Sequence, residues 1–133
     1  MDSKLQIISG RYRGRKLHLP SGARPTQNRA RIALFNMLGA IVDTTYKFTV
    51  WDAFAGSGAF GLEFLSRSPN ARVIFTDVAT ASIRAIRANL DGMDGTNATV
   101  VTADALTRVS EFGATSDLIF VDPPYLAHDT GVA

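Results

Sequence analysis

The chain has 133 residues with a formal net charge of +2, of which 46% are hydrophobic and 20% charged, the balance of one small globular domain. It has no cysteine, which excludes disulfides, thiolate metal sites and a cysteine nucleophile. The only histidines, His18 and His128, lie far apart, no apolar run reaches membrane-spanning length, and the start lacks a signal-peptide core. We expect a cytoplasmic protein with no metal site and no membrane partner.

Charge is distributed unevenly along the chain. Residues 1–35 carry eight basic residues and one acidic residue, a net +7, whereas residues 36–133 carry six basic and eleven acidic residues, a net −5. A basic end on an acidic body suggests that this end meets a polyanion. The simpler alternative is that the arginines only solvate a hairpin.

The first 26 residues are predicted to form a basic arm and a linker. Within residues 5–20, two short apolar-alternating runs flank a Gly- and Arg-rich turn, the pattern of a β-hairpin. Segment 21–26 is predicted to be a linker, because Pro25 ends regular structure and Thr26 can cap a following helix.

The rest of the chain alternates between helical and extended patterns. The predicted helices span 27–42, 59–67, 79–90 and 105–112, and the predicted strands span 48–54, 71–77, 98–104 and 116–122. Such alternation indicates a parallel sheet with helices on both faces. The predicted organisation is therefore an arm and linker at 1–26 followed by an α/β, Rossmann-like domain at 27–133.

Each predicted strand ends at or near an aspartate. These residues are Asp52, Asp77, Asp104 and Asp122. Open α/β sheets bind ligands beside the carboxyl ends of their strands, near the topological switch point. Acids that merely mark where strands meet solvent would explain one or two of the four, so the set predicts a ligand site.

The stretch "WDAFAGSGAFG" (51–61) raises the question of which ligand this is. Its G-x-G-x-x-G begins at Gly56, and Asp77 follows 21 residues later, the spacing of a dinucleotide site. Asp52 would repel a pyrophosphate, since two unit charges about 4 Å apart at an effective dielectric near 20 interact by roughly 4 kcal/mol. The sulfonium and ammonium groups of S-adenosylmethionine would instead be attracted, with Asp77 accepting ribose hydroxyls and Asp104 the adenine amino group. A methyltransferase is favoured, and a dehydrogenase is a remote alternative.

A second motif, Asp122-Pro123-Pro124-Tyr125, follows the last predicted strand. Two prolines direct the chain out of the sheet into a stiff loop. An exocyclic amine on a base is a poor nucleophile because its lone pair is delocalised into the ring. Asp122 and the Pro123 carbonyl can accept its two hydrogens while Tyr125 stacks on an extruded base. The alternative is an ordinary surface turn after a strand.

At this point the chain resembles a known family. The segments "IISGRYRGRKL" (7–17), "RPTQNRARIALFNML" (24–38) and "DAFAGSGAFGLEFLSR" (52–67), together with the D-P-P-Y motif, are similar to the RsmD-type 16S rRNA (guanine-N2)-methyltransferases of bacteria. These are class I enzymes that depend on S-adenosylmethionine.

The resemblance implies roles for individual residues. The methionine part of S-adenosylmethionine would be held by Asp52, Phe54, Gly56 and Gly58, the ribose by Asp77 and the adenine by Asp104, with Arg24 and Thr26 closing over the cofactor. The target guanine would lie on Asp122, Pro123, Pro124 and Tyr125, and RNA phosphates on Arg11, Arg13, Arg15 and Lys16. Such families usually have a second acid where this chain has Ala79, which leaves the adenosine contacts less complete.

The expected function is methyl transfer from S-adenosylmethionine to the N2 of a guanine in 16S rRNA, on an assembling 30S subunit, by a monomer without a metal. A DNA adenine-N6 or cytosine-N4 methyltransferase is an alternative, and so is an inactive RNA-binding remnant. Members of the family continue well beyond the D-P-P-Y motif, so the domain is expected to be truncated after it. The strand ending at Asp122 would then leave an exposed hydrophobic edge, a predicted aggregation site.

Overall fold

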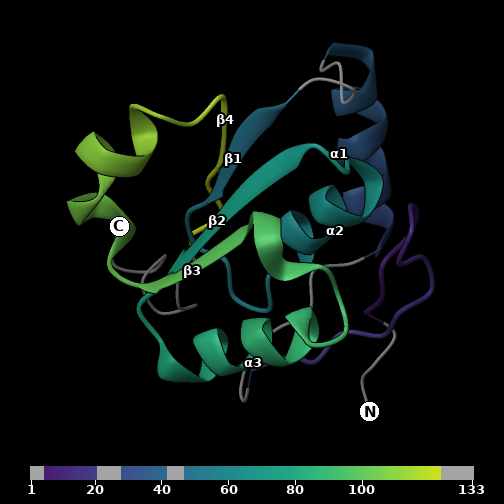
Figure 1. Ribbon diagram of the computed structural model, residues 1–133, viewed down its shortest axis with the longest axis horizontal. Coiled ribbons are helices and arrows are strands. Elements are labelled where there is room, and N and C mark those ends of the chain that lie inside the picture. Colours follow the sequence, from purple (N-terminus) through teal and green to yellow (C-terminus); the bar gives the residue numbers. More distant parts are fainter. Residues whose placement is uncertain (1–4, 21–27, 42–46, 124–133) are drawn as a thin grey trace, which may run out of the picture.

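The computed structural model describes residues 5–20, 28–41 and 47–123, and Figure 1 shows a twisted sheet flanked by helices. The helices are α1 (Asn28–Ile41), α2 (Ala59–Arg67) and α3 (Thr80–Leu90), and the strands are β1 (Phe48–Asp52), β2 (Ala71–Asp77), β3 (Ala98–Thr102) and β4 (Leu118–Phe120). Shorter turns complete the fold: the 3₁₀ helices η1 (Gly95–Asn97) and η2 (Ala105–Thr107), and the π-helical turn η3 (Val109–Gly113).

The four strands form one parallel sheet in the order β3-β2-β1-β4. In its register, Val50 of β1 lies between Val73 of β2 and Leu118 of β4. The chain moves outward from β1 to β3 and then returns to the other side of β1, so the topological switch lies between β1 and β4. The predicted Rossmann-like α/β fold is confirmed.

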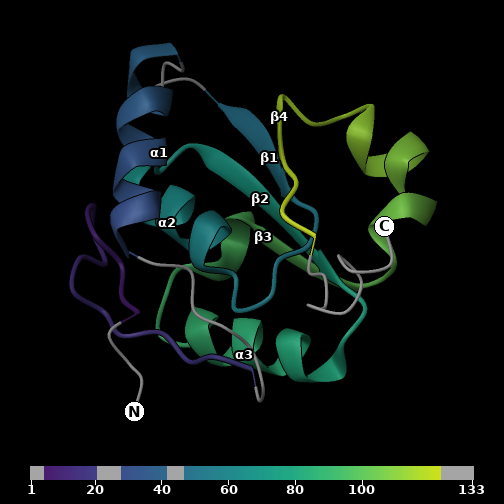
Figure 2. The same ribbon diagram turned by 180° about the vertical axis from the view of Figure 1, so that it is seen from behind.

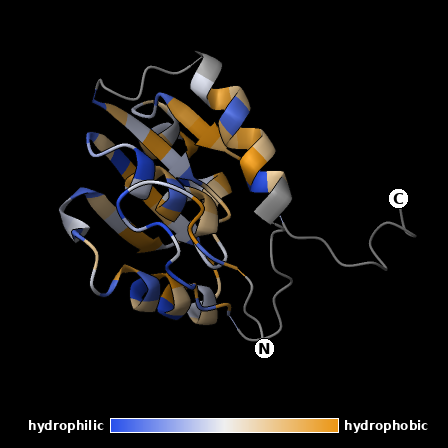
Figure 3. Ribbon diagram, turned by 90° about the vertical axis from the view of Figure 1, so that its right-hand side faces the viewer, coloured by the Kyte–Doolittle hydropathy of each residue, from blue (hydrophilic) through white to orange (hydrophobic). Residues whose placement is uncertain are grey.

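One face of the sheet is packed by the three α-helices. Val50, Val73 and Phe75 share a core with Phe64 of α2 and Ile86 of α3. Figures 1 and 2 both place α1 and α2 on one side of the strands and the η2–η3 segment on the opposite side. In Figure 3 the strands carry orange segments among paler ones. The buried residues of the sheet lie in its two central strands, β1 and β2.

The opposite face differs from the prediction. A helix is predicted at 105–112, but the chain there forms η2 and then η3. The Thr107 side chain donates to the Asp104 carbonyl at 2.8 Å, and such local bonds compete with helix formation. Trp51 and Ile74 pack against this segment, with the Trp51 and Phe112 rings 5.8 Å apart.

The arm folds back on itself as predicted, although it has little regular strand. Gln6 and Lys16 form a single antiparallel bridge, and the Ile7 amide donates to the Arg15 carbonyl at 2.9 Å. Leu5, Ile7 and Leu17 are buried in the same core as the sheet. The arm is therefore packed on the domain rather than standing apart from it.

Within the described residues, no helix is both long and apolar enough to cross a membrane.

Candidate active site

The four strand-end aspartates lie at one edge of the sheet. Asp52 and Asp77 are the last residues of β1 and β2, Asp104 comes two residues after β3, and Asp122 comes two residues after β4. All four strands are parallel, so these positions share the carboxyl edge. The topological switch places Asp52 and Asp122 on neighbouring strands, as the strand order requires.

The two glycines of the loop between β1 and α2 differ in what surrounds them. Both have positive φ, 58° at Gly56 and 84° at Gly58, which favours glycine. A Cβ at Gly58 would lie 3.1 Å from Cγ1 of Ile86, whereas a Cβ at Gly56 would meet no atom within 4 Å. Gly58 thus allows the loop to pack on α3, and Gly56 leaves open space in which a ligand can approach the backbone.

Asp77 ties this loop to the end of β2. Its Oδ2 accepts from the Gly56 amide at 2.9 Å, and its Oδ1 accepts from the Ala79 amide at 2.9 Å. The spacing between Gly56 and Asp77 therefore has a structural reason of its own. Because a carboxylate has about four acceptor positions, Asp77 still has capacity for ribose hydroxyls.

Asp52 is buried beneath the loop, with only 1% of its surface exposed. Its Oδ2 accepts from the Gly61 amide at 3.1 Å, in the first turn of α2. The pKa of Asp52 is raised to about 7: burial is the main cause and the charges of Asp77 and Asp122 add to it, while the bond from Gly61 opposes the rise. A nearby cation would favour the charged form of this carboxyl group.

The other predicted site residues occupy different surroundings. Asp104 is exposed, and its Oδ1 caps η2 by accepting from the Leu106 amide at 3.0 Å. Phe54 is half-buried and packs against the small core cluster that includes Trp51 and Ile74. Asp122 and Pro123 are exposed beyond β4. The remaining four, Arg24, Thr26, Pro124 and Tyr125, lie outside the described residues.

Two apolar side chains at this edge were missed by the sequence analysis. Val78, directly after Asp77, is 67% exposed, and Leu106, two residues after Asp104, is 75% exposed. Exposed apolar groups next to carboxylates suit a flat ring that also carries hydrogen-bond donors. The sequence does contain a signal for both residues, since each is an apolar residue in the turn that follows a strand-end aspartate.

The tip of the arm docks at the far ends of α2 and α3, whereas both helices begin at the carboxyl edge. The Arg11 amide donates to the Ser66 carbonyl at 3.0 Å, and the Arg15 guanidinium donates to the Asp91 carbonyl. Arg11, Arg13 and Lys16 are exposed, and Arg15 is half-buried. The structure thus gathers the predicted phosphate-binding residues in one turn, away from the strand-end acids.

One basic residue of the N-terminal region is unavailable to a polyanion. Arg31 of α1 is 2% exposed, and its Nη1 lies 2.9 Å from Oε1 of the buried Glu63. Burial is the largest influence on Arg31 and lowers its pKa. The net +7 of residues 1–35 therefore overstates the charge presented at the surface.

Glu63 of α2 is a buried hub that the sequence analysis did not identify. Besides Arg31, it accepts from the amides of Ile8 and Ser9 at 3.0 Å each and from Nε of Arg67 at 2.7 Å. This one carboxylate fastens the arm to α1 and α2. Only Arg67, four residues later, is near it in the sequence. The sequence does not show the partners that join Glu63 to the arm and to α1, because Ile8, Ser9 and Arg31 are remote along the chain.

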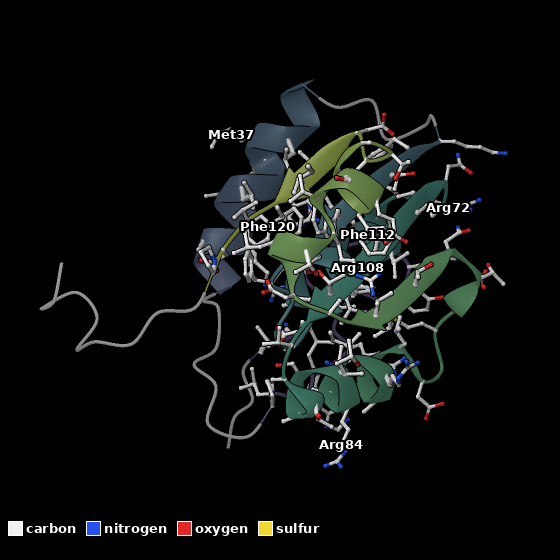
Figure 4. All side chains as sticks on the ribbon, turned by 90° about the vertical axis from the view of Figure 1, so that its left-hand side faces the viewer. Met37, Arg72, Arg84, Arg108, Phe112 and Phe120 are labelled. Atoms are coloured by element: carbon white, nitrogen blue, oxygen red, sulfur yellow. The ribbon has the colours of Figure 1, made fainter. Side chains whose placement is uncertain are left out.

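Two cavities lie away from the carboxyl edge. One of about 260 Å³ is bordered by Phe35 and Phe64, and one of about 460 Å³ lies at the amino ends of the strands beside Lys47 and Arg72. In Figure 4, Arg72 lies far from Arg84, whose side chain points outward from α3. Arg108 lies beside Phe112 on the side of the η2–η3 segment. Neither cavity contains a strand-end aspartate.

Comparison with known proteins identifies related sequences and structures. Residues 5–132 match the family described as conserved hypothetical protein 95. Ribosomal RNA small subunit methyltransferase D of Escherichia coli is 39% identical over 92% of this chain and 61% of its own length. YlbH of Bacillus subtilis, provisionally named an rRNA methyltransferase, is 33% identical over 91% of this chain and 67% of its own length.

A solved structure agrees with these sequence matches. The Escherichia coli protein yhhF, provisionally named a methyltransferase, superimposes with a TM-score of 0.76 at 33% identity, over 93% of this chain and 65% of that one. This chain thus spans about 61% of the length of the Escherichia coli methyltransferase D that it matches.

Proposed function

The chain belongs to the conserved hypothetical protein 95 family of RsmD-type methyltransferases, and on that basis we propose that it methylates the exocyclic N2 of a guanine in bacterial 16S rRNA. The methyl donor is S-adenosylmethionine, and the substrate is the rRNA or an assembling 30S subunit. The proposal includes a cytoplasmic monomer that needs no metal.

The observation that carries this proposal is that β1 separates two groups of residues at the carboxyl edge of the sheet. Asp77, Val78, Asp104 and Leu106 follow β2 and β3 on one side, and Asp122 follows β4 on the other. The first group suits adenosine, with carboxylates for its hydroxyl and amino groups and apolar surfaces for its ring. The loop with open space at Gly56 follows β1, which lies between β2 and β4 in the sheet.

The residues of this chain contribute to the reaction mainly by positioning the guanine amine and the methyl donor. S-adenosylmethionine, when bound, supplies an electrophilic methyl group on a cationic sulfur. Asp122 and the Pro123 carbonyl accept hydrogen bonds from the guanine amine and direct its lone pair toward that methyl group. Asp52, below the loop, favours a cation at this edge when it is ionised. In such a transfer, alignment of the two reactants supplies most of the rate enhancement.

The basic turn supports an RNA substrate. Arg11, Arg13 and Lys16 are exposed, and phosphate contacts by such side chains position a nucleic acid without reading its sequence. Since the arm tip lies at the far ends of α2 and α3, RNA bound at both places extends along these helices. A nine-residue helix such as α2 is about 14 Å long, so this footprint covers more than one nucleotide.

Methyl transfer to defined substrates tests this proposal. Labelled S-adenosylmethionine is incubated with the protein and 30S subunits or 16S rRNA that lack the modification, with a DNA duplex in parallel. Asp122→Ala should lower transfer about 100-fold or more through lost alignment while cofactor affinity stays within about twofold. Asp117→Ala, at an exposed aspartate beside the amino ends of the strands, is the matched control and should retain transfer.

Three results would contradict the proposal. No transfer to either RNA substrate would reject the activity, and transfer to DNA in preference to rRNA would favour the DNA amino-methyltransferase alternative. Equal loss of transfer and cofactor binding in Asp122→Ala would reject the role assigned to Asp122.

A further inference from the structure

The side-chain amide of Asn89 joins two segments that are remote in sequence. Asn89 lies in α3 and is 1% exposed. Its Oδ1 accepts from the His18 amide at 2.6 Å, and its Nδ2 donates to the carbonyls of His18 and Ser57, each at 3.0 Å. It therefore satisfies both backbone groups of His18, as a neighbouring strand would, and uses its second N–H on the glycine loop.

On the loop side, Asn89 holds the residue between the two glycines. The Ser57 carbonyl belongs to the peptide that enters Gly58, and the Gly56 amide before it is bound to Asp77 at 2.9 Å. The glycines give this backbone its conformational freedom. Asp77 and Asn89 therefore restrain the loop from its two sides, at the place where it would contact a ligand.

On the arm side, Asn89 holds the strand that leaves the basic turn. His18 comes two residues after Lys16, and between them the Leu17 amide donates to the Leu5 carbonyl at 3.0 Å. The other strand of the arm is held by Glu63, which lies in α2, the helix that follows the glycine loop. Both limbs of the arm, before and after the basic turn, are thus fastened to elements that adjoin the loop.

We infer that Asn89 couples the arm to the glycine loop, so that binding of S-adenosylmethionine and binding of RNA strengthen each other. This inference rests on the proposed function. A buried donor or acceptor that loses its partner is unfavourable, so neither segment moves independently while the amide bridges them. Linkage is reciprocal: the factor by which the cofactor changes RNA affinity equals the factor by which RNA changes cofactor affinity. Asn89 is a positioning residue in this scheme.

Hydrogen exchange in the unaltered protein tests the coupling directly. The His18 amide is bonded to Asn89 Oδ1, so its exchange reports on the arm while the ligand occupies the loop. S-adenosylhomocysteine, which binds without turnover, should slow exchange at His18 about fivefold or more. The Asp117 amide, bonded to the Thr49 carbonyl at the amino ends of the strands, is the control and should exchange at an unchanged rate.

RNA affinity with and without S-adenosylhomocysteine supplies the second measurement. In the unaltered protein the ligand should tighten binding of a 16S rRNA transcript about fivefold or more. Asn89→Asp keeps an acceptor for the His18 amide but has no N–H for the carbonyls of His18 or Ser57. In this variant the ratio of RNA affinities with and without S-adenosylhomocysteine should fall to about 1. In the matched control Asn97→Ala, which removes a side-chain amide bonded to the Pro69 carbonyl at 3.2 Å, the ratio should persist.

The outcomes separate this inference from the proposed function. If the unaltered protein binds no S-adenosylhomocysteine, both are rejected. If it binds the ligand and methylates rRNA while His18 exchange and RNA affinity stay the same, the coupling alone is rejected. If Asn89→Asp does not fold, the exchange measurement on the unaltered protein still decides between these results.

Discussion

Asp52 and Glu63 are both buried carboxylates, in β1 and α2, yet their surroundings are opposite. Glu63 is surrounded by four hydrogen-bond donors, two of which belong to arginines. Asp52 has the Gly61 amide as its partner and has the charges of Asp77 and Asp122 nearby. Burial of a charge is tolerated when it is paired and hydrogen-bonded. The two residues therefore respond in opposite ways to loss of charge.

Asp52→Asn should remove a pH-dependent destabilisation. The pKa of Asp52 rises from 3.8 to about 7 on folding, so the folded protein binds more protons than the unfolded chain between these values. The free energy of unfolding of the unaltered protein then falls as pH rises from about 4 to 7 and levels off above. At pH 8 the variant should be more stable by about 1–4 kcal/mol, and near pH 4 the two should be equal.

Urea titrations followed by Trp51 fluorescence at several pH values measure this difference. Parallel pH profiles for Asp52→Asn and the unaltered protein would show that Asp52 is not the titrating group.

Glu63→Gln should be strongly destabilising. The substitution leaves Arg31, which is 2% exposed, without its counter-charge, and breaking one partner of a buried pair costs about 3–5 kcal/mol. In the control Glu111→Gln, the pair with Arg108 has side chains 56% and 37% exposed, and an exposed pair is worth less than about 1 kcal/mol. Chemical denaturation of both variants provides the comparison, and similar losses would reject the role of Glu63 as a hub.

Among the elements, the arm shows how backbone shape governs docking. Its turn approaches the end of α2 so closely that a Cβ at Gly10 would lie 2.1 Å from the Ser66 carbonyl oxygen. The Ser66 hydroxyl also donates to the Ser9 carbonyl at 2.7 Å and accepts from the Tyr12 amide at 3.0 Å. Docking of the arm on α2 therefore depends on Gly10, which has no side chain, and on the hydroxyl group of Ser66.

Gly10→Ala should displace the arm. Its φ of 92° adds about 1–2 kcal/mol of strain for alanine, and the clash with Ser66 adds to it, for a loss of about 3 kcal/mol or more. Gly14→Ala is the matched control, because its φ is 85° but no atom lies within 4 Å of the added Cβ. Gly14→Ala should therefore lower the stability only by the backbone strain, without the contribution of a clash. Thermal unfolding ranks the two, and equal losses would indicate that the arm is not packed tightly against α2.

For the molecule as a whole, β4 is the strand that we expect to pair with another chain. It pairs with β1 on one side and is one of the two terminal strands of the described sheet, β3 being the other. Ile119 and Val121 are 40% and 60% exposed. An exposed apolar edge strand can pair with another chain, so the aggregation site expected from the sequence stays a prediction to be tested.

Ile119→Lys should reduce concentration-dependent association of this chain, because a charge on an edge strand opposes pairing. Ile32→Lys in α1 is the matched control, since Ile32 has the same 40% exposure but lies on a helix. Sedimentation velocity over a range of concentrations measures the effect. An equal reduction in both variants would point to net charge rather than to the β4 edge.

Much of the fold and part of the candidate site could be predicted from local pattern. Strands that are buried on both faces are apolar along their length, so 71–77 is recognised without its neighbours. The limits of the other strands were predicted about two residues too long, because the sequence does not show where pairing stops. The 105–112 segment was misassigned because its side chains bond to the nearby backbone.

The sequence by itself determined the alternation of strands and helices, the aspartates at the strand ends, the glycine loop and the D-P-P-Y motif, since each depends on residues that are close together along the chain. Only the tertiary structure decided that Arg31 is buried on Glu63 and that Asn89 joins His18 to Ser57. It also decided that Asp52 is buried and bonded to the Gly61 amide of α2. The physical reason is that burial and hydrogen-bond pairing between distant residues arise only once the sheet has brought them together.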